Sequence, residues 1–318
     1  MYIDKRYGVV LTFFCVSALA APPSQTKVYR TDYTYSKQTD AFYKLHTESR
    51  STAKAREKCD TEGAKLMVPL PQDITQLHAM LKRYPDLGNY VLVESDRQTH
   101  DPAGSSAHTT ISSYMGGEVP MVPMDSEPAY ELMECEVVTR NGDVESTGCW
   151  RDAPFICKVD AASAPYDEQC GTYGKDYIPK KTVGSCYKVP KIVYSWNEAY
   201  AECEAEGAHL VVLNSEAEHE VVKTIMDTAA PVRGSKTTYF FFAGIRANHP
   251  TDGTPRVFKT ISNQTLEEAG YFQWSDNEPN NYQDAEYCGS LFKNDGKYND
   301  LNCSHEYAFI CEKEAQIL

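Results

Sequence analysis

The sequence predicts an α+β protein of two tandem, disulfide-bonded domains, each with two helices, small antiparallel sheets and a long irregular loop. Three observations predict this class: the second half of the chain repeats the first, the cysteines are even in number once a leader is removed, and helix-capping patterns precede strand-like apolar runs. About 300 residues remain after the leader, enough for two domains that each bury their own core.

The first 20 residues have the pattern of a cleaved secretory signal. A basic start precedes an apolar run over residues 8–19, and small residues stand at Ala18 and Ala20. An uncleaved membrane anchor is the alternative, but the run is shorter than the roughly 18 apolar residues that span a bilayer. We therefore expect cleavage after residues 1–20, a secreted protein and no membrane insertion.

Charge and cysteine content agree with an extracellular protein. The formal net charge of −14 argues against nucleic acid or an anionic lipid surface as a partner. Removing the leader, with Cys15, leaves an even number of cysteines, and no C-x-x-C spacing indicates a metal–thiolate site. In an oxidising compartment these cysteines predict a set of disulfides.

Residues 42–70 and 186–214 carry the same pattern twice. Their common register places Cys59 on Cys203, 144 residues apart, and the closing motifs "PFICK" and "AFICE" repeat 154 residues apart. The chain is thus a tandem duplication with a slightly longer second copy. Other matched pairs are Tyr43 and Tyr187, Lys44 and Lys188, Ser51 and Ser195, Glu62 and Glu206, Gly63 and Gly207, Ala64 and Ala208, and Leu66 and Leu210.

The repeat divides the chain into five segments. The junction between the copies is rich in small residues and contains proline, which is typical of a linker. The stretch after the leader is polar. The predicted segments are a signal peptide at 1–20, a polar lead-in at 21–40, a first domain at 41–159, a linker at 160–169 and a second domain at 170–314.

The elements are clearest in the second copy. Ser195 and Glu198 form a capping-box pattern that opens a helix, and Gly207 is a suitable left-handed stop for it. An aromatic run predicts a buried strand, and a long polar tract with Gly and Pro separates it from a last strand. A second capping-box pattern, the aromatic run and the last strand lie at Ser215 and Glu218, at residues 238–245 and at residues 307–311.

These features together resemble the C-type lectin-like domain, twice over. In that family a helix cysteine bridges to the last-strand cysteine, a second bridge lies inside that pair, and the long form has an extra amino-terminal bridge. The tandem secreted arrangement is similar to the insect haemolymph lectins called immulectins, which implies innate immunity and microbial surfaces. The implied disulfides are Cys59–Cys157 and Cys135–Cys149 in the first domain, and Cys170–Cys186, Cys203–Cys311 and Cys288–Cys303 in the second.

The stretch "EPNNYQDAEYCGSLFKNDGKYND" gathers oxygen donors at the positions where the family holds calcium. Carried over by motif, the ligands supply three carboxylates and two side-chain amides, and Ca²⁺ prefers such hard oxygen donors. Zinc would require His or Cys instead. A solvated, turn-rich Asn/Asp loop is the alternative. The implied calcium and carbohydrate ligands are Glu278, Asn280, Glu286, Asn299 and Asp300.

The resemblance also implies how this site would read a sugar. Two neighbouring hydroxyls complete the calcium shell, donate hydrogen bonds to the carboxylates and accept them from the amide groups. The Glu-Pro-Asn order resembles the mannose-type motif, with a cis Glu278–Pro279 bond, rather than the galactose-type Gln-Pro-Asp. Tyr298 replaces the usual Trp, and Asn281 and Tyr287 stand where some relatives carry acids for an auxiliary ion, so we expect one calcium.

The first domain does not repeat this chemistry. A thioether replaces one carboxylate and both amides are absent, so we expect weak calcium binding at most. A protein partner, a spacer role or another mode of ligand recognition all remain open for this domain. The residues at the equivalent positions are Asp125, Glu127, Met133, Glu145 and Ser146.

An enzyme and a protein-binding module are the two alternatives to a lectin. The eight histidines form no i, i+4 metal pair and no Gly-x-Ser-x-Gly elbow occurs, so we expect no enzyme. Glu278 and Glu286, as calcium ligands, would not be free to act as a glycosidase's general acid. The main alternative is a calcium-independent, protein-binding C-type lectin-like protein. Asn263 and Asn302 begin N-glycosylation sequons, and we expect modification at Asn302, beside Cys303, to be inefficient.

Overall fold

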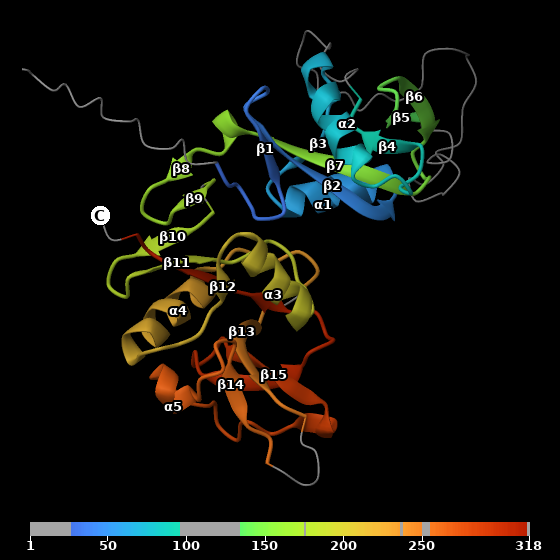
Figure 1. The fold of residues 1–318 in the computed structure, drawn as a ribbon. Coiled ribbons are helices and arrows are strands. Elements are labelled where there is room, and N and C mark those ends of the chain that lie inside the picture. Colours follow the sequence, from blue (N-terminus) through green and yellow to red (C-terminus); the bar gives the residue numbers. More distant parts are fainter. Residues whose placement is uncertain (1–26, 96–133, 175, 236–237, 250–254, 317–318) are drawn as a thin grey trace, which may run out of the picture.

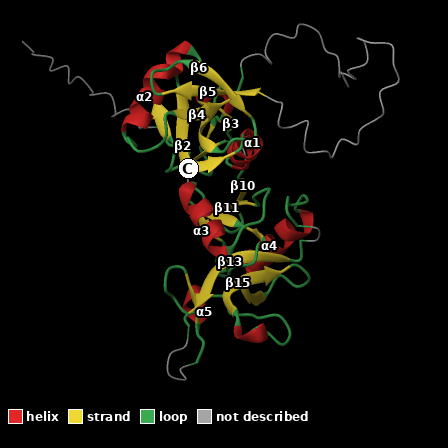
Figure 2. Ribbon diagram, turned by 90° about the vertical axis from the view of Figure 1, so that its right-hand side faces the viewer, coloured by secondary structure: helices red, strands yellow, loops and turns green. Residues whose placement is uncertain are grey.

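The structure is a computed structural model that describes residues 27–95, 134–174, 176–235, 238–249 and 255–316. These residues form two units stacked one above the other, as the two views in Figures 1 and 2 show. The expected signal peptide at 1–20 lies outside the described residues. Among those described, no helix is long and apolar enough to cross a lipid bilayer.

The first unit is a single sheet with a helix on each face. Alternate residues of its central strands point to opposite sides: Phe42 packs in the cluster that holds Ala55 of α1, whereas Tyr43 packs in the cluster that holds Leu77 of α2. The elements are β1 (Thr34–Ser36), β2 (Ala41–Arg50), α1 (Thr52–Thr61), β3 (Lys65–Leu66), the 3₁₀ turn η1 (Pro71–Asp73), α2 (Ile74–Lys82), β4 (Tyr90–Val93), β5 (Glu134–Thr139), β6 (Val144–Gly148) and β7 (Ala153–Asp160).

The expectation of small antiparallel sheets is wrong for this unit. Seven strands form one sheet in the order β1-β2-β7-β4-β5-β6, with β3 also paired to β7. The reason is a parallel contact between β4 and β7, at Leu92 and Phe155, which joins two antiparallel groups of strands. Sequence patterns indicate strands but not which edges meet, so this junction was not predictable from them.

The second unit has two small sheets and three helices. One sheet runs β10-β11-β18-β12, and the other runs β14-β13-β15-β16 with β17 parallel to β13. The elements are β10 (Ile178–Lys180), β11 (Ser185–Lys188), α3 (Trp196–Ala205), β12 (His209–Leu210), α4 (Glu216–Thr228), β13 (Phe240–Ala247), β14 (Phe258–Thr260), α5 (Leu266–Ala269), the 3₁₀ turn η5 (Tyr282–Asp284), β15 (Glu286–Phe292), β16 (Tyr298–Asn302), β17 (Ala308–Phe309) and β18 (Cys311–Glu314).

The helix ends of the second unit follow their sequence signals. Ser195 and Glu198 form the capping box at the start of α3, and Gly207 beyond its end has φ +67°. Ser215 caps α4 by accepting a bond from Glu218 N at 3.2 Å. The Glu218 carboxylate does not return the bond to Ser215. It is buried and accepts from Asn214 N at 2.7 Å and from the Tyr187 hydroxyl, so this pattern gives a single cap.

Five disulfides join the described cysteines in the pairing that the family resemblance implies. Cys59–Cys157 and Cys203–Cys311 each tie a helix to the last strand of their unit. These two bonds span 98 and 108 residues, and closing loops of that length is worth about 4–5 kcal/mol in the chain-entropy account. The remaining bonds are Cys135–Cys149, Cys170–Cys186 and Cys288–Cys303.

The described part of the expected lead-in and the expected linker carry structure of their own. Strand β1 pairs with β2 and so extends the first sheet before residue 41. The 3₁₀ turn η4 (Ala161–Ser163) and strand β8 (Tyr166–Asp167) occupy the linker, and β8 pairs with β9 (Thr172–Tyr173). Arg30, only 2% exposed, crosses to the second unit and pairs with Glu202 of α3 at 2.5 Å. Thr31 N donates to Ala205 O at 2.6 Å beside it.

Candidate calcium and carbohydrate site

Two paired strands at the far end of the second unit carry three of the five predicted ligands. Glu286 begins β15, which lies at the end of the second unit away from the first (Figure 1). Asn299 and Asp300 lie in β16, paired with Ser290 and Gly289. The neighbouring Cys288–Cys303 bond fixes the hairpin. Asn299 and Asp300 are buried, and the loop that precedes β15 contacts Asp300 through bonds from Asn280 N and Asn281 N.

Tyr298, the expected substitute for Trp, packs at the base of this hairpin. It is fully buried, and its ring contacts those of Tyr271 and Trp274. Its hydroxyl accepts a hydrogen bond from Leu213 N at 3.0 Å. The aromatic packing is therefore kept, and the added hydroxyl satisfies a buried backbone donor.

The Glu-Pro-Asn turn folds back onto Asp300. The Glu278–Pro279 bond is cis, in agreement with the expectation. Asn280 N donates to Asp300 Oδ1 at 3.0 Å, and the Asn280 side-chain amide donates to Glu278 Oε1 at 2.8 Å. The structure thus brings three predicted ligands from two segments into direct contact.

The other two ligands flank this contact. Asn299 Nδ2 donates to the main-chain oxygen of Asp300 at 2.6 Å. Glu286 Oε2 accepts from Tyr282 N at 2.9 Å, and Glu286 N donates to Asn281 Oδ1 at 3.2 Å. Asn281, which stands where some relatives carry an acid for an auxiliary ion, here organises the loop through hydrogen bonds.

The carboxyl groups of Glu278 and Glu286 resist ionisation. Burial, followed by the proximity of Asp300, raises the pKa of Glu278 to about 7. Burial and Asp300 also raise the pKa of Glu286. Acids that are both partly buried and close to another carboxylate are stabilised in their charged form by a cation. The donor set, three carboxylates and two amides, fits a hard cation such as Ca²⁺.

An arginine missed by the sequence analysis lies within this group. Arg256 Nη1 forms an ion pair with Asp300 Oδ2 and donates to the main-chain oxygen of Glu286. Its side chain is 12% exposed. The pattern gave no signal for it, because Arg256 precedes Asp300 by 44 residues in an irregular polar tract.

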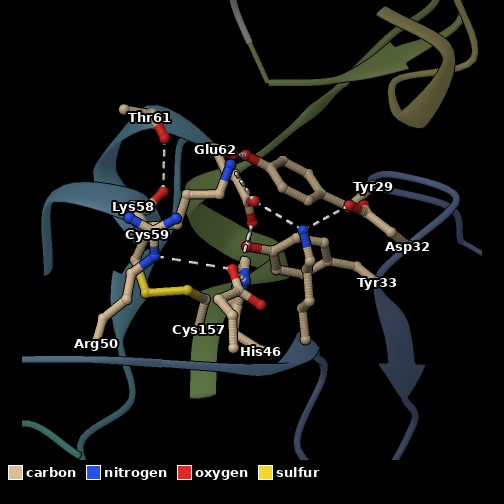
Figure 3. The surroundings of a disulfide bond; sticks show 12 residues. Tyr29, Asp32, Tyr33, His46, Arg50, Lys58, Cys59, Thr61, Glu62 and Cys157 are labelled. Carbon is tan, nitrogen blue, oxygen red and sulfur yellow. Dashed lines mark hydrogen bonds and ion pairs between the residues drawn. A yellow bond between two sulfur atoms is a disulfide. The ribbon is translucent and has the colours of Figure 1, made fainter. Parts of the chain in front are cut away.

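The predicted carboxylates do not form a tight three-ligand cluster. Within the described residues, two groups have three acid, imidazole or thiol ligand atoms that all lie within 4.8 Å of one another. In one of these groups Cys157 is committed to a disulfide with Cys59, as Figure 3 shows, and cannot ligate. The groups are His46, Glu62 and Cys157, and Glu216, His219 and Glu220.

The described residues of the first unit offer little at the equivalent end. Glu145 and Ser146 lie exposed on β6, paired with Val137 and Glu136 of β5. Asp125, Glu127 and Met133 lie outside the described residues. Of the two sequon residues, Asn263 is exposed in a turn with φ +63°, and Asn302 Oδ1 accepts from Ser304 N at 2.9 Å.

Comparison with known proteins identifies the family. The family model for the lectin C-type domain matches residues 192–313, which lie in the second unit. A C-type lectin mannose-binding isoform of the snake Notechis scutatus scutatus is 30% identical over 143 residues, which cover 43% of this chain and 81% of the snake protein. The chain belongs to the C-type lectin family.

A second relative agrees with this family. A hemolymph lipopolysaccharide-binding protein of the cockroach Periplaneta americana is 34% identical over 129 residues, 40% of this chain and about half (48%) of the cockroach protein. Among solved structures, the mouse scavenger receptor C-type lectin carbohydrate-recognition domain matches with 22% identity and a TM-score of 0.36, over 45% of this chain and 97% of that domain. C-type lectins are non-enzymatic, which confirms the expectation that the chain is not an enzyme.

Proposed function

We propose that this C-type lectin binds carbohydrate through calcium held in the second unit, with mannose-type specificity. The observation that carries the proposal is the contact of Glu278 and Asn280 with the buried Asp300, beside Glu286 and Asn299 on the same hairpin. Five oxygen-bearing side chains thereby gather at one exposed end of the unit. The printed name of the snake relative, a mannose-binding isoform, supports the same sugar class.

Calcium, when bound, would accept two sugar hydroxyls as ligands and so link the polypeptide to the saccharide. The chain's own residues supply the rest. Glu278 and Glu286 accept hydrogen bonds from the hydroxyls, while Asn280 and Asn299 donate to them through their amide groups. The bonds from Asn280 N and Asn281 N to Asp300 hold the loop in place against β16. This order of donors and acceptors favours vicinal hydroxyls such as those of mannose.

We also propose that residues 41–159 are a degenerate first C-type lectin-like domain and residues 170–314 the long-form functional one, secreted after loss of residues 1–20. The support is the repeated cysteine framework and the repeated contacts discussed below. The name of the cockroach relative, a hemolymph lipopolysaccharide-binding protein, supports microbial surfaces as the target and innate immunity as the setting.

Elution from immobilised mannan tests the proposal. We expect the full chain to be retained on mannan in the presence of calcium and to be released by EDTA. On a glycan array we expect binding to mannose-type sugars only when calcium is present. Glu278→Gln with Asn280→Asp should move the preference toward galactose, because the donor and acceptor positions exchange. Equal binding of both versions to the same sugars would contradict the specificity, and retention despite EDTA would contradict the calcium bridge.

A protein-binding role is the second candidate, and it applies to the first unit. Its described equivalents of the ligand positions, Glu145 and Ser146, are exposed and lie on a flat strand pair rather than in a ligand cluster. The experiment is capture on immobilised mannan after Asp300→Ala. Binding that survives this change and EDTA would favour a calcium-independent contact, and complete loss would assign recognition to the second unit.

A further inference from the structure

Arg256 lies within the proposed calcium site, and its positive charge offsets part of the negative charge of the carboxylates there. Its guanidinium pairs with Asp300 Oδ2, and Asp300 is fully buried. The rings of Phe258 and Tyr287 lie 5.1 and 6.0 Å from the guanidinium carbon and form a wall beside it. This arginine is therefore placed by packing as well as by charge.

The oxygens of Asp300 have few free lone pairs. Oδ1 accepts from Asn280 N at 3.0 Å, and Oδ2 accepts both from Asn281 N at 2.9 Å and from Arg256. A cation that takes Oδ2 of Asp300 as a ligand must therefore replace one of its two partners. The backbone bonds belong to the Glu-Pro-Asn turn itself, so the replaceable partner is the guanidinium.

Electrostatics points to the same exchange. An arginine side chain stays protonated at every physiological pH, so it cannot make room by losing its charge. A divalent ion beside Asp300 would repel a guanidinium that is only 12% exposed, since screening by water is weak there. The single negative charge of this buried carboxylate cannot balance both cations.

We propose that Arg256 is an internal competitor for calcium: it occupies Asp300 in the metal-free protein, keeps the ligand loop in place and must leave when calcium binds. The inference rests on the proposed calcium-dependent function and adds to it a residue that sets the calcium threshold. The wild-type site then binds calcium more weakly than the same five ligands would without the arginine. In return, the metal-free loop stays attached to β16.

Isothermal titration of calcium into the full chain, wild type and Arg256→Gln, is the test. We expect the variant to bind calcium about tenfold more tightly, a typical effect of removing one close charge partner. Lys259→Gln is the matched control, because this exposed lysine lies on the adjoining strand β14, donates to Asn263 Oδ1 at 3.4 Å and carries the same charge. We expect it to change calcium affinity by less than about twofold.

Thermal melting without metal gives a second readout. In EDTA we expect Arg256→Gln to melt at a lower temperature than wild type, since Asp300 loses its buried partner, and saturating calcium should raise its melting temperature more than it raises that of wild type. Should Arg256→Gln fail to fold, Arg256→Lys replaces it in the test. The lysine side chain is shorter and lacks the planar fork of a guanidinium, so this variant should bind calcium more tightly than wild type.

The outcomes separate the two proposals. Tighter calcium binding by Arg256→Gln than by Lys259→Gln supports the competitor. Equal calcium affinity in wild type and both variants overturns the proposal that Arg256 competes with calcium, and it leaves the proposed function standing. A calcium affinity of Arg256→Lys equal to that of wild type has the same meaning. Absence of calcium binding in every variant overturns the proposed function, and the competitor with it.

Discussion

The two units share a framework near their interface and differ at their far ends. In the first unit Lys44 pairs with Glu62 at 2.7 Å, and the Tyr33 hydroxyl donates to Glu62 at 2.8 Å. In the second unit, 144 residues later, Lys188 pairs with Glu206 at 2.5 Å, and the Tyr177 hydroxyl donates to Glu206 at 2.9 Å. The two units thus share the contacts that tie a helix end to the sheet, whereas the residues at the ligand positions differ.

A second repeated position has reversed its chemistry. In the first unit Tyr43 donates to Asp73 at 2.6 Å, and Lys158 pairs with the same carboxylate at 3.1 Å. In the second unit Tyr187 donates to Glu218, and Glu312 takes the place of the lysine. An ion pair has become a pair of buried acids. Burial, and then Glu218, raises the pKa of Glu312 to about 9. One scaffold thus tolerates opposite charge arrangements as long as a proton balances them.

The largest difference between the units should be in metal binding. Asp300→Ala removes the buried carboxylate to which Asn280 and Arg256 are bonded, so we expect calcium affinity to fall by roughly a hundredfold or more. Glu145→Ala removes an exposed acid at the corresponding end of the first unit and should leave affinity unchanged. Calcium titration of both variants makes the measurement. Equal losses would mean that the first unit also holds the ion.

The second-largest difference between the units should be in the free energy of unfolding that their buried glutamates contribute. Glu62 is 1% exposed and accepts hydrogen bonds from Tyr33, Lys44 and His46, as Figure 3 shows in part. Glu62→Gln should therefore lower the free energy of unfolding by about 3 kcal/mol. Glu206→Gln is the matched change in the second unit, and it also touches Arg30 at the interface. Urea unfolding of both variants is the measurement. A cost below about 1 kcal/mol for Glu62→Gln would show that these contacts do not hold the first unit together.

Acid should act on Glu62 in a known direction. The pKa of Glu62 is depressed, against the effect of burial, by its bonds to His46 and by the charge of Lys44. A depressed carboxyl pKa contributes stability above the unfolded-state value near 4.5, and that contribution is lost as pH falls toward the folded value. The difference in stability between wild type and Glu62→Gln should therefore narrow as pH falls below about 4.5.

Much of the framework was predictable, and the cause is local. The capping box at Ser195 and the stop at Gly207 depend on a few neighbouring residues, so the sequence pattern alone predicts them. The disulfide pairing followed from the family resemblance. Arg256 was not predictable, because its contact with Asp300 requires knowing how an irregular tract returns to β16. The joined seven-stranded sheet was missed for the same reason, since it depends on one long-range strand contact.

Rising pH should act on the second unit through the buried acid pair. The raised pKa of Glu312 means that its contribution to stability is complete below the unfolded-state value and is lost as pH rises through about 9. Between the unfolded-state value near 4.5 and about 9 we expect a loss of about 1.4 kcal/mol per pH unit from this group, and no further loss above about 9. Glu312→Gln, which mimics the protonated acid, should abolish that part of the loss. If wild type and variant lose stability in parallel between about pH 5 and 9, the pKa of Glu312 is not raised in the folded protein.

The smallest predicted difference concerns the residue before the Asn-Asp pair. Tyr298 is fully buried and its hydroxyl accepts from Leu213 N, whereas Val144, which the 154-residue register places opposite it in the first unit, is 52% exposed. Tyr298→Phe keeps the ring but leaves a buried backbone donor without its partner, so it should cost about 1 kcal/mol. Val144→Ala should stay within about 0.5 kcal/mol of wild type. Thermal unfolding with calcium present measures both. Tyr298 adjoins two ligands, so calcium titration gives a second readout. A fall in calcium affinity beyond about twofold in Tyr298→Phe would mean that the Tyr298 hydroxyl also aligns Asn299 and Asp300. A change in stability without a change in affinity would mean that this hydroxyl serves packing alone.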